Sequence, residues 1–158
     1  MEKKIMIQAN SLDKLIDVLL FMLTHPDCTM EDVAEYIGFS QRQVDYYTNA
    51  LRYLGLLDQA RKPTPYALDI YANHKVDLKE RVYACILSDP IICCIFAQCY
   101  LLPDSDVLAY AIELLTEEYP GYSTAVYHRR ADNLVKWCQR IISYHNNYIL
   151  PSLQNSKK

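Results

Sequence analysis

Residues 29–68 read TMEDVAEYIGFSQRQVDYYTNALRYLGLLDQARKPTPYAL, and the fold that we predict starts from this stretch. Thr29 can cap a short helix whose third residue, Asp32, accepts a hydrogen bond from the amide of the capping residue. Gly38 tolerates left-handed dihedral angles, and Ser40 forms a second capping box with Gln43. The pattern predicts two helices joined by a tight turn, with the second helix beginning directly after Ser40.

The second of these helices has an apolar face and a polar face. Val44, Tyr47, Leu51 and Leu54 recur at steps of three and four residues, so they form the buried stripe. Gly55 then ends the helix as a C-terminal cap. At about 100° per residue, the opposite face and its flanks hold Gln41, Arg42, Asp45, Tyr46, Asn49, Arg52 and Tyr53.

A small β-wing is expected after the second helix. Leu56–Leu57 and Tyr66–Leu68 are predicted as two short strands around residues 58–65, and Arg61 and Lys62 lie at the tip of that loop. A helix with such a loop normally enters the major groove of DNA, where Arg, Asn and Gln read base edges and basic side chains hold phosphates. We expect base contacts from Gln41, Arg42, Asp45, Tyr46 and Asn49, and phosphate contacts from Arg52, Arg61 and Lys62.

The second half of the chain is predicted to be all-helical. Helices are expected at residues 77–87, 90–101, 104–116 and 123–144, with Pro103 and Pro120-Gly121 as the breaks. The predicted fold class is therefore mainly α. Its three parts are a winged helix-turn-helix over residues 1–76, a helical subdomain over residues 77–148 and a flexible tail over residues 149–158.

The last of these helices also has two faces. Its apolar stripe consists of Tyr127, Ala131, Leu134, Cys138 and Ile141. Its polar stripe, within roughly a 60° arc, consists of Arg129, Asn133, Lys136 and Arg140, with Arg130 beside it. Because the steps match those of the first polar face, one interpretation is a degenerate second winged-helix-like unit that also contacts DNA. The other interpretation is an ordinary solvated helix face.

The composition is that of a globular chain of 158 residues, 51% apolar and 22% charged. Residues 15–23 and 91–102 are apolar but too short to cross a bilayer of about 30 Å as helices. Residues 1–10 lack the apolar core of a secretory signal, so a cytoplasmic location without a membrane partner is expected. The six cysteines form no CxxC pair and no zinc-finger spacing, so we expect reduced, packed thiols and no metal or cofactor.

Charge is distributed unevenly, although the net value is only −3. Residues 11–40 carry one base against six acids, a net −5, whereas residues 41–62 carry four bases against two acids, a net +2. Residues 77–122 carry two bases against eight acids, a net −6, and residues 124–158 carry six bases against one acid, a net +5. The predicted groove helix, its loop and the last helix are thus the basic parts of an acidic chain, which favours a local nucleic-acid contact.

The chain has a family resemblance that rests on three blocks of sequence in a fixed order. These blocks are SQRQVDYYTNALRYLGLL, RVYACILSDPIICCIF and TAVYHRRADNLVKWCQRII. From residue 11 to about residue 143 it resembles the winged-helix DNA-recognition region of a group of type II restriction endonucleases and related restriction-modification proteins. The most specific pieces are VDYYTNALRYLGLL and the run from Arg129 to Trp137. The family's closing run often has a second aromatic residue three positions after the tryptophan, where this chain has Arg140. The resemblance implies a DNA-recognition module of a restriction system.

A nuclease site is not expected in this chain. A metal-dependent nuclease of that group gathers carboxylates and a lysine on a sheet edge. Pro26-Asp27 and Asp77-Leu78-Lys79 match the letters of such a motif, but the first lies in a predicted loop between helices and the second opens a helix. No GxSxG, HExxH or phosphate-cradling glycine loop occurs either.

Three functions stay open on these observations. The first is sequence-specific binding of double-stranded DNA for restriction or its control, with a nuclease partner or a homodimer as candidate assemblies. The second is transcriptional repression of a defence operon by a homodimer that reads paired half-sites. The third is a winged helix used for protein interaction, favoured by the net acidity and by the outward Tyr46 and Tyr53. The salt dependence of binding separates the DNA-binding functions from the protein interaction, because DNA binding releases counterions and therefore weakens as salt is added.

Overall fold

The computed structural model describes residues 6–74 and 76–155 as a mainly helical chain, as predicted. The chain divides into two compact units between Asp89 and Pro90. The boundary predicted after residue 76 lies inside the first unit, because the helix that follows it contacts the helix that precedes it. No single helix within the described residues is both long and apolar enough to cross a membrane.

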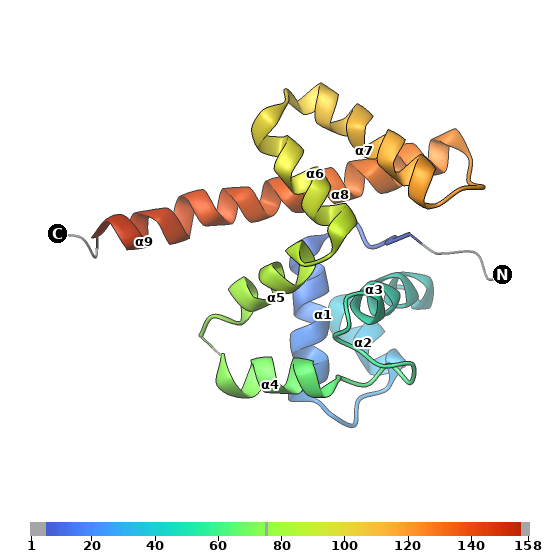
Figure 1. Ribbon diagram of the computed structural model, residues 1–158. Helices are drawn as coiled ribbons and strands as arrows, with labels where there is room; N and C mark the ends of the chain where they lie inside the picture. The colour runs from blue at the N-terminus through green and yellow to red at the C-terminus, as the bar shows by residue number, and fades with distance from the viewer. Residues whose placement is uncertain (1–5, 75, 156–158) are drawn as a thin grey trace. The chain divides into compact units, whose positions relative to one another are not determined.

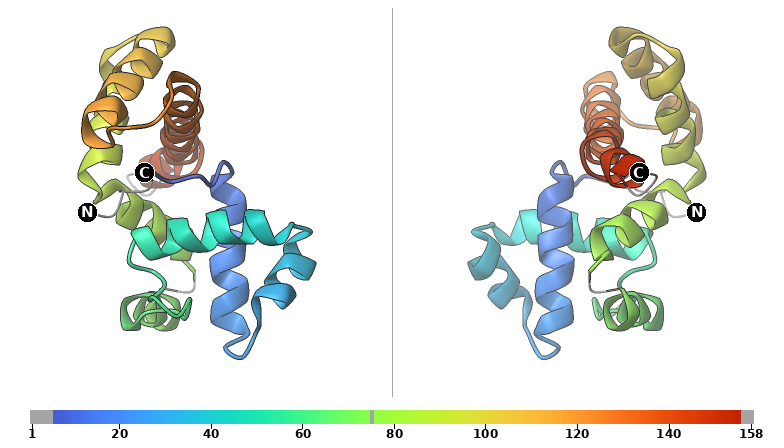
Figure 2. Two further views of the ribbon diagram at one scale, coloured as in Figure 1. Left: turned by 90° about the vertical axis from the view of Figure 1, so that its right-hand side faces the viewer. Right: turned by 90° about the vertical axis from the view of Figure 1, so that its left-hand side faces the viewer.

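Three helices form the body of the first unit: α1 (Leu12–Thr24), α2 (Met30–Ile37) and α3 (Gln41–Tyr53). Each of the three contacts the other two, and Figure 2 shows α3 running across α1. Both predicted capping boxes are confirmed, at the start of α2 and at the start of α3. Gly38 ends α2 in the left-handed conformation, with φ of 81°, so α3 can turn away after only Phe39 and Ser40.

The core of the first unit forms where α1 and α3 cross. Leu15, Val18 and Leu19 of α1 are at most 1% exposed, and Val44 and Leu51 of α3 are fully buried. Tyr47 is also buried in this core, and its ring stacks on Phe39. The Tyr47 hydroxyl accepts a hydrogen bond from the Ser11 amide at 2.9 Å and donates one to Asn10 Oδ1 at 2.8 Å. The predicted apolar stripe of α3 is thus confirmed for these residues, while Leu54, its fourth member, is half-buried.

The predicted β-wing is wrong in its strands. No strand occurs in the described residues after α3, and a single isolated antiparallel bridge joins Leu57 to Pro63. The second predicted strand, Tyr66–Leu68, lies instead in α4 (Pro65–Asn73), because Thr64 caps that helix and Pro65 suits its first turn. A short helix, α5 (Leu78–Leu87), follows α4 in the same unit.

The second unit is built around its long helix. α6 (Pro90–Leu101) and α7 (Asp104–Glu118) both contact α8 (Thr124–Tyr144), and all three predicted helices are confirmed within two residues at each end. The stripe predicted from Tyr127 to Ile141 is buried at every one of its five positions. Apolar side chains of the other two helices, both of which contact α8, are buried as well. Among them are Ile92 and Ile95 of α6 and Val107, Ala111 and Leu115 of α7.

Helical structure continues beyond α8. A five-residue π-helix, His145–Ile149, leads into α9 (Leu150–Asn155), and Figure 1 shows these segments prolonging α8 as one rod. The tail predicted from residue 149 is therefore helical as far as Asn155, since backbone hydrogen bonding passes through the π-turn without a break. The last three residues of the predicted tail lie outside the described residues.

Candidate nucleic-acid interface

The outer face of α3 carries the residues that the sequence predicts to read bases. Gln41 and Arg42, in the first turn, are exposed, and Asp45, Tyr46 and Asn49 are half-buried. The capping box of Ser40 and Gln43 fixes where this face begins, because it satisfies the backbone amides of both residues. The Gln43 amide donates to Ser40 Oγ at 3.3 Å, and the Ser40 amide donates to Gln43 Oε1 at 3.1 Å. The five predicted base-reading residues therefore lie along one rigid helix.

A tight loop follows α3 and is organised by Asp58. The Asp58 carboxylate accepts hydrogen bonds from the amides of Ala60 and Lys62, at 2.9 and 3.0 Å. The Asp58 amide donates to the Lys62 carbonyl at 2.8 Å, which closes the loop from the other side. Sequence reasoning missed this role, although an aspartate at the start of a turn is the usual signal for such side-chain hydrogen bonds.

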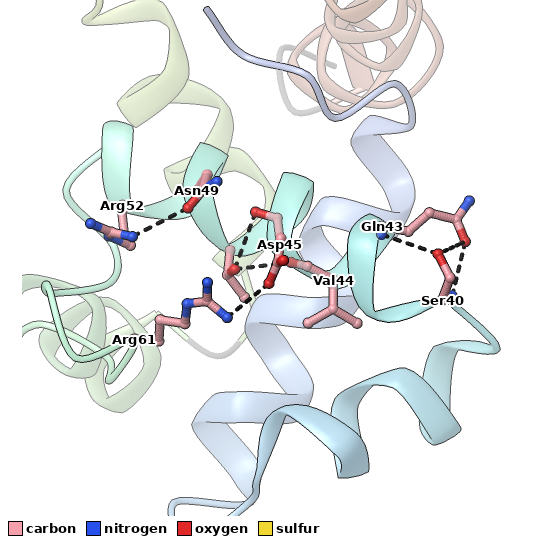
Figure 3. A network of polar contacts seen from close by, with 8 residues as sticks. Ser40, Gln43, Val44, Asp45, Asn49, Arg52 and Arg61 are labelled. Atoms are coloured by element: carbon pink, nitrogen blue, oxygen red, sulfur yellow. Dashed lines mark hydrogen bonds and ion pairs between the residues drawn. The ribbon is translucent and has the colours of Figure 1, made fainter. Parts of the chain in front are cut away.

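The loop is fastened to α3 by an ion pair. Arg61 Nη1 lies 3.0 Å from Asp45 Oδ1, and the two side chains are 30% and 48% exposed (Figure 3). Arg61 adopts the left-handed backbone conformation, with φ of 60°, which costs a residue with a Cβ roughly 1 kcal/mol or more. The ion pair thus holds the tip of the loop beside the second turn of α3.

A second arginine links the end of α3 to the same loop. Arg52 Nη1 donates to Asn49 Oδ1 at 3.2 Å, and Arg52 Nη2 donates to Gln59 Oε1 at 2.5 Å. Arg52 Nε is buried without a hydrogen-bond partner in the described residues. Asn49, Arg52 and Gln59 also line a pocket of about 280 Å³ together with the N-terminal Met6 and Ile7. Gln59 was not among the predicted site residues, and its pairing with a residue seven positions earlier carries no local sequence signal.

Arg42 and Tyr46 form a pair on the exposed side of α3. Arg42 Nε donates to the Tyr46 hydroxyl at 2.5 Å, and the guanidinium carbon lies 5.5 Å from the centre of the Tyr46 ring. A cation over an aromatic face is attracted by the ring quadrupole. The pair therefore gives the first two turns of α3 a positively charged, partly aromatic outer surface.

Lys62 completes the basic tip of the loop. Its side chain is exposed, and no hydrogen bond or ion pair involves that side chain within the described residues. Its charge reaches Cys28, in the turn before α2: burial raises the pKa of the Cys28 thiol, and the Lys62 ammonium partly opposes that rise. The charge of the loop tip therefore acts on the turn before α2 as well as on α3.

The predicted residues of α8 lie in the second unit. Arg129, Lys136 and Arg140 are exposed, whereas Arg130 and Asn133 are half-buried. Lys136 Nζ pairs with Asp132 Oδ2 at 2.9 Å, one helical turn earlier. This neutralisation lowers the positive charge of the stripe, which is what an ordinary solvated helix face shows.

No group of three or more His, Cys, Asp or Glu side chains that could hold a metal ion occurs within the described residues. Pro26-Asp27 lies in the turn between α1 and α2, and Asp77 is the N-cap residue of α5, which are the two settings predicted for these motifs. The cysteines are all free thiols. The expectation that they are packed is confirmed for Cys85 and Cys138 and wrong for Cys93 and Cys94, which are exposed on α6.

Comparison with known proteins gives one match. A family model described as a domain of unknown function, DUF7226, matches residues 14–146, a span that includes both units. No curated protein and no solved structure matches the chain.

Proposed function

We propose that this chain, which belongs to the DUF7226 family of domains of unknown function, binds double-stranded DNA through α3 and the loop at residues 58–62. The observation that carries the proposal is the ion pair between Arg61 and Asp45, which joins the basic loop to the polar face of α3. Helix and loop then present one continuous surface, as in a helix-turn-helix protein whose recognition helix is flanked by a wing. In this chain the wing would be a loop closed by one isolated β-bridge, in place of a β-hairpin.

The first turns of α3 suit the floor of the major groove. The N-terminal residues of a recognition helix are the ones that normally reach base edges. Gln41 and Arg42 are exposed at that end of α3, and a guanidinium or an amide can form bidentate hydrogen bonds with a base. Because Arg42 donates a hydrogen bond to the Tyr46 hydroxyl, its guanidinium is already ordered before DNA binds.

The two other arginines have a different part in the proposal. Arg52 and Arg61 donate hydrogen bonds to Asn49 and Asp45 and so orient those side chains. Only the terminal N–H groups that the hydrogen bonds leave unused are proposed to contact phosphates, because Arg52 Nε is buried. Lys62, whose side chain makes no ion pair in the described residues, is the phosphate contact of the loop. A left-handed Arg61 supports this division, because strained non-glycine residues are retained where the surrounding structure requires them.

The biological setting follows from the sequence resemblance alone. Residues 11–143 resemble the DNA-recognition region of restriction-modification proteins, so we propose recognition of a DNA site in such a system as the role of the contact. The residues of α8 stand apart from this proposal, because Lys136 is already paired with Asp132 and the stripe needs no nucleic acid to explain it.

Fluorescence anisotropy with a labelled duplex of mixed sequence, measured at several salt concentrations, tests the proposal. Wild-type affinity should fall steeply with added salt, and Lys62→Ala should reduce the slope of log K against log salt by about 1. Arg129→Ala removes one positive charge from an exposed position of α8, which the proposal does not use, and is the control, which should leave the slope unchanged. Absence of binding at low salt, or equal slopes for Lys62→Ala and wild type, would overturn the proposal.

A further inference from the structure

A second surface of the first unit lies between the end of α1 and α2, and it uses none of the residues of the proposed DNA contact. It is an open pocket of about 540 Å³, which we call the α1–α2 pocket. Three of its residues are aromatic, Phe21, His25 and Tyr36, and three are carboxylates, Asp27, Asp32 and Glu35. Neither Lys nor Arg lines it.

The aromatic side of the α1–α2 pocket is a stack of three rings. The Phe21 ring lies between His25, at 4.3 Å between ring centres, and Tyr36, at 4.4 Å. The imidazole is held by contacts of Nδ1 with the Phe21 carbonyl and with Thr24 Oγ1, both at 3.0 Å. Phe21 covers one face of the Tyr36 ring, and Tyr36 is still 61% exposed, so its other face is open. An open aromatic face attracts cations and planar guanidinium groups.

The carboxylates give the pocket its charge. Asp32 is partly occupied, because its Oδ2 accepts the Thr29 amide at 2.9 Å in the capping box. Asp27 and Glu35 make no hydrogen bond or ion pair within the described part of the chain. Lys62, although its charge reaches Cys28, pairs with neither of them. Two carboxylates without a hydrogen bond or an ion pair thus lie beside an open aromatic ring.

We propose that the α1–α2 pocket binds an arginine-bearing segment of a protein partner, with the guanidinium laid on the Tyr36 ring and hydrogen-bonded to Asp27 and Glu35. Charge complementarity selects this occupant. A phosphate or an acidic segment would be repelled by the three carboxylates, and a purely apolar segment would bury them without a partner, which is costly. Arginine fits better than lysine because its planar group stacks on an aromatic ring and donates two parallel hydrogen bonds to a carboxylate.

The test is anisotropy of labelled peptides of equal length that alternate glycine with arginine, lysine or glutamate. The arginine peptide should bind most tightly and the glutamate peptide should not bind. Asp27→Asn/Glu35→Gln should weaken the arginine peptide about 5- to 10-fold, and Tyr36→Ala should weaken it about 2- to 5-fold. The control Glu117→Gln/Glu118→Gln removes the same charge from exposed positions of α7 and should bind as wild type does.

The proposal would be overturned if the wild-type protein and the pocket variants bound the arginine peptide with equal affinity. It would also be overturned if the pocket and control variants lost affinity equally, because equal losses would indicate attraction by net charge alone. Self-association that disappears in Asp27→Asn/Glu35→Gln, seen by sedimentation, would assign the pocket to a second copy of this chain and overturn a separate partner. The same double variant should bind DNA at least as well as the wild-type protein. Failure of the DNA proposal and failure of this one are therefore distinguishable.

Discussion

The hydroxyl group of Tyr47 offers the sharpest test of how the first unit is held together. Tyr47 is 3% exposed, accepts a hydrogen bond from the Ser11 amide and donates one to Asn10 Oδ1. Ser11 is the N-cap residue of α1, so a side chain of α3 fixes the start of another helix. Tyr47→Phe removes both hydrogen bonds and keeps the ring that stacks on Phe39.

The size of the effect follows from the two partners. A typical intramolecular hydrogen bond contributes about 0.5–1.5 kcal/mol net, and a buried group left without a partner costs more than an exposed one. Asn10 is exposed and can turn to water, whereas the Ser11 amide is half-buried. We therefore expect Tyr47→Phe to lower the free energy of unfolding by about 1–2 kcal/mol.

Urea unfolding followed by far-ultraviolet circular dichroism measures this loss. With a slope of about 2 kcal/mol per molar urea, the midpoint of the first unit's transition should fall by roughly 0.5–1 M. Trp137, the single tryptophan, lies in the second unit, so its fluorescence follows that unit separately. Tyr36→Phe is the matched control, because Tyr36 is 61% exposed, and it should change stability by less than about 0.5 kcal/mol. An unchanged midpoint in Tyr47→Phe would refute the reasoning.

The same residue predicts a dependence on pH. Burial raises the pKa of Tyr47 in the folded protein above the ordinary tyrosine value, while hydrogen bonds from the Ser11 region oppose the rise. The neutral hydroxyl is thus favoured by folding. Its contribution to stability is complete below about pH 10, where the unfolded tyrosine is also protonated, and is lost as the pH rises through the folded pKa. Tyr47→Phe should remove this part of the alkaline loss, which unfolding midpoints at pH 9 and above would show.

Three further outcomes are expected. Ser40→Ala removes the capping box of α3 and should destabilise the first unit by about 1 kcal/mol in urea unfolding, with Ser105→Ala, an exposed position on α7, as a neutral control. Gly38→Ala meets no atom within 4 Å but must adopt φ of 81°, so it should cost about 1 kcal/mol, and a neutral result would contradict the left-handed turn. In thiol labelling of the native protein, exposed Cys93 should react quickly, and buried Cys138, whose pKa burial raises far above the usual range, should react only on unfolding.

Local chemistry explains which parts of the fold were predictable from the sequence. Both capping boxes join residues three positions apart, and Gly38 acts within its own turn, so α2 and α3 could be placed from neighbouring residues. The same holds for α6 and α7, because α6 begins at Pro90 and α7 begins directly after Pro103. α4 was missed although its signal was present, because Tyr66–Leu68 was interpreted as a strand when Thr64 and Pro65 already indicated a helix start.

The features of the site that could not be predicted from the sequence are those that join distant parts of the chain. Arg61 and Asp45 are sixteen positions apart, and both were predicted to contact DNA without any indication that they pair with each other. The stack of Phe21 on Tyr36 joins two helices whose relative placement no local pattern sets. Patterns of three and four residues fix which face of a helix is polar, but tertiary packing decides which polar side chains meet across elements.

The measurement that tests the central claim most directly is selection of bound sequences from a pool of random duplex DNA at two salt concentrations. The wild-type protein and Arg42→Ala/Asn49→Ala would be compared, since this pair changes the proposed base-reading face and leaves the loop lysine in place. We predict that the wild-type protein enriches one motif, that the double variant loses it and that both retain weak, salt-sensitive binding to all sequences. Enrichment of the same motif by the double variant, or no retention of DNA by the wild-type protein at the lower salt concentration, would contradict the account.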